Sequence, residues 1–110
     1  MADISELVAA LPDKSLLLLD DDAPLRTRLG RALEQRGFSV TLCASVAEAM
    51  TALRTHAPAH AVLDMRLEDG TGLKVVEAVR DVRPDAKVIM LTGYGNIATA
   101  VTAVKLVRVR

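Results

Sequence analysis

Acidic and hydroxyl side chains follow three apolar runs of this sequence, at the point where each run ends. Asp20 and Asp21 follow LLLL, Asp64 follows HAVL, and Thr92 follows VIML. If the runs form neighbouring parallel strands, their carboxyl ends bring these four side chains into one shallow cleft. Clustered carboxylates repel one another unless a proton or a cation lies between them, and oxygen ligands without a nearby Cys or His favour Mg²⁺. The pattern therefore predicts a magnesium site with room for a phosphate.

The same cluster predicts a nucleophile for phosphorus chemistry. Asp64 ends the stretch HAVLD, and its carboxylate can attack a phosphoryl group once a metal neutralises the charges that oppose the approach. Thr92 supplies a hydroxyl and Gly93 a backbone N–H, and both groups can hold phosphate oxygens. Each feature also has an ordinary explanation, because an aspartate at the end of a strand is common and TGYGN is typical of a turn.

The elements that must position these residues are visible in the hydrophobic pattern. Short continuous apolar runs alternate with segments of helical period, which is typical of βα units around a parallel sheet. We expect a doubly wound α/β fold with strand order 2-1-3-4 and helices on both faces of the sheet. The expected strands are 15–19, 39–43, 60–63 and 87–91, each followed by a helix, with a marginal additional turn at 3–10.

Cap and turn residues define the ends of the expected helices. Asp22 is suited to the N-cap of the first helix, with Pro24 in its first turn and Gly37 at its end. Ser45 and Glu48 have capping-box spacing at the start of the second helix. The residues that mark the third helix, its stop and the cap of the fourth are Val75, Val76, Val79, Val82, Pro84 and Asn96.

Size and composition bound the class of protein. The chain has 110 residues, enough for one domain with one core, and its 14 basic and 14 acidic residues leave no net charge. We therefore expect no direct nucleic acid binding by this chain. No apolar run approaches the roughly 20 residues of a membrane span, so we expect no membrane association. The single cysteine cannot form an internal disulfide, and the expected location is cytoplasmic.

Three stretches in register resemble the receiver domain of bacterial two-component response regulators. They are LLLLDDDAPLR, AVLDMRLEDGTGL and VIMLTGYGN, in the order and at the spacings of that family. The stretches RLEDGTGL and LTGYGNIATAVTAVKL further resemble the redox-responsive global regulators of proteobacteria, whose full-length members attach a small helix-turn-helix DNA-binding domain. The resemblance implies the flavodoxin-like (CheY-like) receiver fold and a role in regulating transcription through an output domain absent here.

The resemblance also implies a role for each site residue. Asp64 is expected to be the phosphoacceptor, taking its phosphoryl group from a sensor histidine kinase. Asp21 is expected to bind Mg²⁺ directly, Asp20 directly or through water, and the backbone carbonyl of Arg66 to complete the protein ligands. Thr92 is the expected switch hydroxyl, which turns toward the phosphoryl group and shifts a two-state equilibrium.

The sequence departs from the family pattern at its C-terminal end. Receiver domains have a fifth strand, which ends in a lysine that pairs with the phosphate, and a last helix, whereas this sequence reads VRVR after VKL. We expect an N-terminal extension at 1–14 and an incomplete receiver domain at 15–110, matching the family over 15 to about 106. The exposed edge of the fourth strand is then expected to be covered by a homodimer, by an exchanged segment or by the tail 107–110, unless that tail extends a helix or frays.

Two other functions fit parts of the pattern. A phosphorylation-silent dimerisation or interaction fragment would explain the incomplete fold. A phosphohydrolase with an aspartate nucleophile would explain Asp64, but such enzymes usually carry a second aspartate two residues on, where this chain has Arg66. The favoured interpretation is a self-phosphorylating receiver, which is not a conventional enzyme.

Several reactive residue types have plainer interpretations. His56 and His60 are not expected to bind a metal together, because Pro58 breaks the helix that would align them. Cys43 is expected to be a small buried residue. Four arginines of the first helix lie largely off its leucine stripe and are expected to face solvent, with kinase docking as an alternative: Arg26, Arg28, Arg31 and Arg36.

Overall fold

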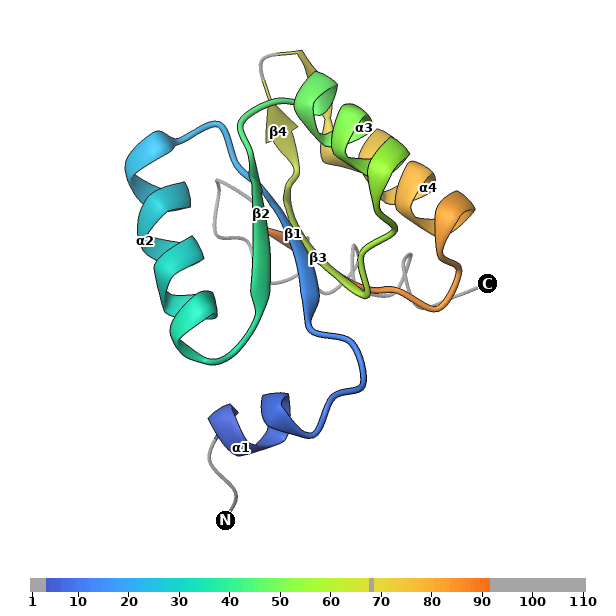
Figure 1. Cartoon of the computed structure of the whole chain (residues 1–110). Helices are drawn as coiled ribbons and strands as arrows, with labels where there is room; N and C mark the ends of the chain where they lie inside the picture. The colour runs from blue at the N-terminus through green and yellow to red at the C-terminus, as the bar shows by residue number, and fades with distance from the viewer. Residues whose placement is uncertain (1–3, 68, 92–110) are drawn as a thin grey trace.

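The computed structural model describes residues 4–67 and 69–91 (Figure 1). The expected fourth helix, Thr92, Gly93 and the tail 107–110 lie outside the described residues. The elements in chain order are α1 (Ile4–Ala9), β1 (Ser15–Leu19), α2 (Ala23–Gln35), β2 (Ser39–Cys43), α3 (Val46–Thr55), β3 (His60–Asp64), β4 (Arg66–Leu67), β5 (Gly70–Thr71), α4 (Gly72–Val82) and β6 (Lys87–Leu91).

The larger sheet of the described chain is parallel, with strand order β2-β1-β3-β6. Leu17 of β1 pairs with Thr41 of β2 on one side and Ala61 of β3 on the other, and Ala61 pairs with Val88 of β6. Helix α2 covers one face of the sheet, and α3 and α4 lie side by side on the other (Figure 1). The predicted order 2-1-3-4 and the flavodoxin-like α/β architecture are confirmed.

The alternation of side chains along β1 divides the core between the two faces. Leu17 and Leu19 point toward α3 and α4, whereas Leu16 and Leu18 point toward α2, and all four are buried. Every residue of the run LLLL is therefore enclosed, as a central parallel strand requires. The main buried side chains on the α3 and α4 face are Leu17, Leu19, Cys43, Val46, Ala49, Leu53, Ala61, Leu63, Val75, Val76, Val79, Val88 and Met90.

Two details differ from the expectation. Strand β3 includes Asp64 as its last residue, one position beyond the expected end. Strand β2 lies at the edge of the described sheet, as the order 2-1-3-4 predicts, and Leu42 in it is 46% exposed. Val82 is also 46% exposed, because the apolar stripe of α4 leaves the core at its last residue.

The predicted caps of α2 and α3 are confirmed. The Asp22 carboxylate accepts a hydrogen bond from the Leu25 N–H at 3.1 Å, and Gly37 follows the end of α2 with a φ of +106°. The Ser45 hydroxyl accepts from the Glu48 N–H at 3.1 Å. The Glu48 carboxylate accepts from the N–H of Ala44 at 2.9 Å, one residue earlier than in the usual capping box.

A short antiparallel hairpin, formed by β4 and β5, was not predicted. Arg66 pairs with Thr71 and Leu67 with Gly70, immediately after the end of β3. Strands of two residues are too short to show the alternation of apolar and polar residues by which a strand is predicted. The Asp69-Gly70 dipeptide, which is typical of hairpin turns, was the one signal in the sequence that could have indicated the hairpin.

The N-terminal segment 4–14 packs against the amino end of the sheet. Val8 is buried, and Asp13 forms an ion pair with Arg83 at 2.7 Å, across 70 residues of sequence. Arg83 also donates to the carbonyl oxygen of Ala57 at 3.0 Å. Hydrogen bonds from the Ser15 N–H and from the Arg83 guanidinium hold the pKa of Asp13 well below its ordinary value. In the described ranges, none of the helices is long and apolar enough to cross a bilayer.

The lowered pKa of Asp13 predicts a pH-dependent contribution to stability. A carboxyl with a depressed pKa in the folded state stabilises it above its ordinary pKa near 4. That contribution is lost as pH falls through the folded-state pKa. We expect Asp13→Asn to lower the free energy of unfolding near pH 7, and to make it depend less steeply on pH in the acid range.

Urea unfolding monitored by circular dichroism between pH 3 and pH 7 measures both effects. Asp85→Asn is the matched control, because Asp85 lies 3.7 Å from Arg83 Nε with a side chain that is 78% exposed. Equal behaviour of the two variants would contradict the assignment.

Candidate functional site

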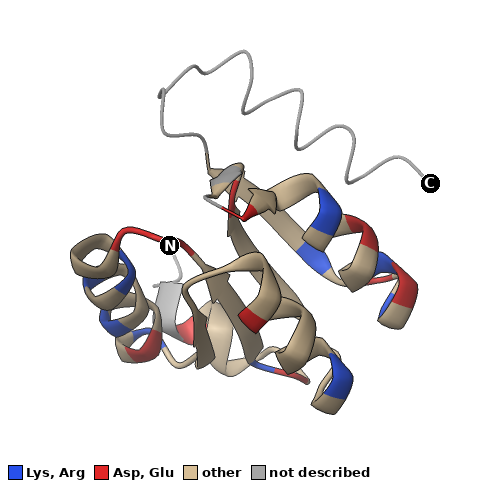
Figure 2. Ribbon diagram, turned by 90° about the horizontal axis from the view of Figure 1, so that it is seen from above, with Lys and Arg blue, Asp and Glu red and all other residues tan. Residues whose placement is uncertain are grey.

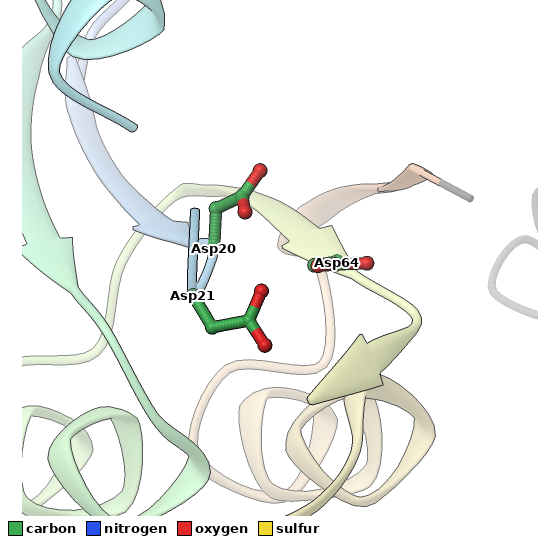
Figure 3. A group of neighbouring side chains, drawn as sticks. All are labelled: Asp20, Asp21 and Asp64. Carbon is green, nitrogen blue, oxygen red and sulfur yellow. The ribbon is translucent and has the colours of Figure 1, made fainter. Parts of the chain in front are cut away.

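The acidic residues predicted to meet at the carboxyl end of the sheet do so. Asp20 and Asp21 follow β1, Asp64 ends β3, and one carboxylate oxygen of each lies within 4.8 Å of the others (Figure 3). Figure 2, viewed onto this end of the molecule, shows the acidic segment that leads into α2. Since β1 and β3 are hydrogen-bonded neighbours, the parallel register itself brings the residues after Leu19 and Leu63 together.

Asp20 is the buried member of the cluster and takes part in several hydrogen bonds. It is 3% exposed, and its N–H donates to the Cys43 carbonyl oxygen at 3.1 Å. Its carboxylate accepts from the Asp22 N–H at 2.9 Å, and its main-chain oxygen accepts from the Arg26 guanidinium at 2.7 Å. Arg26 was expected to face solvent, but the structure places its guanidinium against the site. No side-chain pattern indicated this contact, because it is made to a backbone atom.

Asp64 is half-buried at the end of β3, and the chain immediately after it is fixed by the backbone. The Met65 N–H donates to the Leu91 carbonyl oxygen at 2.9 Å, which ties the segment to β6. The Gly72 N–H donates to the Met65 carbonyl oxygen at 3.0 Å. A Cβ at Gly72 would overlap the carbonyl oxygen of Asp64, so the close approach of α4 to the site requires glycine here.

The Arg66 carbonyl is placed by the hairpin. Residues that face each other in an antiparallel pair alternate between hydrogen-bonded and non-hydrogen-bonded positions. Because Gly72 donates to Met65, the next facing pair, Arg66 and Thr71, occupies a non-hydrogen-bonded position. In such a pair the N–H and C=O groups point away from the facing strand, so the Arg66 carbonyl is directed away from Thr71. The predicted switch residue Thr92 lies outside the described residues.

The donor set suits a hard divalent cation. Three carboxylates crowd together, one buried, one exposed and one half-buried, and their charges repel when all are ionised. A cation at their centre relieves that repulsion, and oxygen ligands with room for water match the coordination of Mg²⁺. Asp22 does not belong to the cluster, because its side chain caps α2, as predicted.

The side chains of Cys43 and His60 do not belong to the acidic cluster. Cys43 is 2% exposed, and burial, with a smaller contribution from the Glu48 carboxylate, raises the pKa of its thiol to about 11. His60 lies at the opposite end of β3 from Asp64, where its Nε2 is 3.2 Å from the Asp13 carbonyl oxygen. The thiol is therefore an apolar core group, as predicted.

One residue near the site was missed. Asp69, in the turn between β4 and β5, accepts hydrogen bonds from the backbone N–H groups of Val46 and Ala47 at 3.0 and 3.1 Å. These two residues lie 23 and 22 positions away in the sequence, beyond the reach of any capping pattern.

Comparisons with known proteins give a consistent result. The family model described as the response regulator receiver domain matches residues 16–108, close to the expected 15 to about 106. The acid tolerance regulatory protein ActR of Rhizobium meliloti (strain 1021) is 59% identical over 95 residues, covering 86% of this chain and 49% of ActR. The photosynthetic apparatus regulatory protein RegA of Rhodobacter capsulatus is 55% identical over 94 residues, covering 86% of this chain and 51% of RegA.

A solved structure has the same fold. The crystal structure of a response regulator from Burkholderia pseudomallei, with a phosphorylated aspartic acid, a calcium ion and citrate, superposes with a TM-score of 0.74 at 36% identity. The match covers 84% of this chain and 55% of that one. The chain spans about half the length of the curated relatives it matches.

The crowding of carboxylates predicts that removing one charge stabilises the metal-free chain. We expect Asp21→Asn, measured in EDTA, to raise the free energy of unfolding by more than the roughly 0.5 kcal/mol typical of surface substitutions. Asp21 is the right member to change because it is exposed, whereas Asp20 is buried and accepts a backbone hydrogen bond. Asp81→Asn, at an exposed position of α4, is the control for net charge. A destabilised Asp21→Asn chain would show that the carboxylates do not repel one another significantly.

Proposed function

The chain belongs to the response regulator receiver domain family, and on that premise we propose that Asp64 is its phosphoacceptor. The observation that carries the proposal is the meeting of Asp20, Asp21 and Asp64 at the carboxyl ends of β1 and β3. Asp64 is the half-buried member of the cluster and ends strand β3. The next residue, Met65, is hydrogen-bonded through its backbone to Leu91 of β6 and to Gly72 of α4. The Burkholderia pseudomallei protein carries its phosphoryl group on an aspartic acid, which supports the same assignment here.

The proposed cofactor is Mg²⁺, held by the carboxylates of Asp20, Asp21 and Asp64 and by the backbone carbonyl of Arg66. When bound, the ion neutralises negative charge on the carboxylates and on the incoming phosphoryl group. The burial of Asp20 and its hydrogen bond from the Asp22 N–H keep one ligand in place before the ion arrives.

In the proposed reaction an oxygen of the Asp64 carboxylate forms a bond to phosphorus while the bond from phosphorus to the donor breaks. With a phosphohistidine donor, the imidazole nitrogen leaves with the bonding electron pair, and the ring takes up one proton from solvent to become neutral imidazole. The product is an acyl phosphate on Asp64. Thr92 is proposed as the hydroxyl that turns toward the phosphoryl oxygens and transmits the change.

The proposed partner is a sensor histidine kinase, and the proposed location is the cytoplasm. ActR and RegA are regulatory proteins about twice as long as the matched region, so we propose that this receiver regulates transcription through an output domain. The chain is proposed to accept a phosphoryl group once per cycle, not to act as a conventional enzyme.

A homodimer is a second proposal, favoured by exposed apolar surface on β6. Ile89 is 53% exposed, although its neighbours in the strand, Val88 and Met90, are buried. In the described part of the sheet, β6 is the outermost strand on that side. A second copy of the chain packed on this surface would cover Ile89.

The metal site predicts stabilisation by Mg²⁺. At a concentration 100 times the dissociation constant, a ligand that binds only the folded state raises the free energy of unfolding by about 2.7 kcal/mol. We expect this gain in urea unfolding, its reversal by EDTA, and its loss in Asp21→Asn. Asp81→Asn should retain it. An equal gain in both variants would show that Mg²⁺ binds elsewhere.

Phosphorylation of Asp64 predicts a mass increase of one phosphoryl group when the chain is incubated with acetyl phosphate and Mg²⁺. Intact-mass spectrometry should detect the adduct, and EDTA or Asp64→Asn should abolish it. Asp85→Asn, at an exposed position remote from the cluster, should leave it unchanged. An adduct that survives Asp64→Asn would disprove the assignment, and steady turnover of a phosphate ester would favour the phosphohydrolase instead.

A further inference from the structure

The carboxylate of Asp69 caps a helix to which it does not belong. One oxygen accepts from the Val46 N–H at 3.0 Å and the other from the Ala47 N–H at 3.1 Å. These are the first two residues of α3, whose N–H groups have no acceptor within the helix. Ser45 satisfies the next donor, that of Glu48. The N-terminus of α3 is thus completed by a side chain from the β4–β5 hairpin.

Charge and packing both favour this contact. The N-terminus of a helix carries partial positive charge and stabilises a carboxylate. The two backbone hydrogen bonds accordingly lower the pKa of Asp69. Next to it, a Cβ at Gly70 would lie 3.4 Å from Cγ2 of the buried Val46, so the turn rests directly on α3. Leu67, on the other strand of the hairpin, packs against the core.

The opposite end of the hairpin lies at the acidic cluster. Gly72 donates to Met65 and lies against the carbonyl of Asp64, which fixes the base of the hairpin beside the phosphoacceptor position. Between base and turn, Arg66 and Leu67 pair with Thr71 and Gly70. Two strands of two residues are too short to be stable alone, so the position of the hairpin depends on its anchors.

From these contacts we propose that Asp69 is a positioning residue for the metal site. By holding the turn of the hairpin on α3, it fixes the direction of the Arg66 backbone carbonyl, and so sets the affinity for Mg²⁺. This rests on the proposed function, in which that carbonyl is a ligand. Linkage makes the effect reciprocal: binding of Mg²⁺ strengthens the contact between Asp69 and α3 by the same factor.

The experiment compares Mg²⁺ binding to the whole chain and to three variants by isothermal titration calorimetry. We expect Asp69→Ala to weaken binding about tenfold, the lower end of the effect typical of residues that orient metal ligands. Asp69→Asn keeps one acceptor oxygen and should give an intermediate loss. Ser45→Ala removes a cap from the same helix without touching the hairpin, and should change the affinity less than twofold.

Backbone amide resonances separate a positioning role from a structural one. In the unsubstituted chain, Mg²⁺ should shift the amide signals of Val46 and Ala47, although neither residue belongs to the acidic cluster. Asp69→Ala should abolish these shifts while the circular dichroism spectrum shows that α3 persists.

Each alternative outcome is informative. Unchanged affinity in Asp69→Ala, with the amide signals of Val46 and Ala47 showing that the contact is lost, would overturn this inference and leave the metal site standing. An equal loss in Ser45→Ala would assign the effect to helix stability and overturn it as well. Failure of the unsubstituted chain to bind Mg²⁺ would instead overturn the proposed function, and the inference with it.

Discussion

The burial of apolar strands on both faces of the sheet is the constraint that gathers three carboxylates at one end of this structure. Asp20, Asp21 and Asp64 each have a carboxylate oxygen within 4.8 Å of those of the other two. The apolar run LLLL and its neighbour HAVL are enclosed on both faces of the sheet, so the strands end where they do regardless of the charges that follow. The free energy gained by burying these leucines holds the acids together. Function at this end of the sheet therefore depends on hydrophobic packing along its length.

Much of this arrangement was readable from the sequence because the signals are local. The strands and helices follow from hydrophobic period, the ends of α2 and α3 from the chemistry of Asp22, Ser45 and Glu48, and the acidic cluster from strand order. The parallel order converts three separate strand ends into one site. The pairing of the strands was the one long-range feature needed to place Asp20, Asp21 and Asp64 together.

What escaped prediction joins segments that are distant in sequence or involves backbone atoms. Asp69 reaches α3 across more than twenty residues, and Arg83 reaches Asp13 across 70. Arg26 binds a carbonyl oxygen, which every residue possesses, so no side-chain pattern marks its partner.

The cap on α3 has a consequence for how this surface can vary. Asp69 binds N–H groups and makes no demand on the side chains that carry them. At the exposed Ala47, natural sequences can therefore accept almost any residue, with proline as the exception because it has no N–H. The hairpin and the helix can diverge independently in related proteins while the link between them persists. Variation at position 47 would then reflect the proteins that bind the surface around the start of α3, and not the requirements of the acidic cluster.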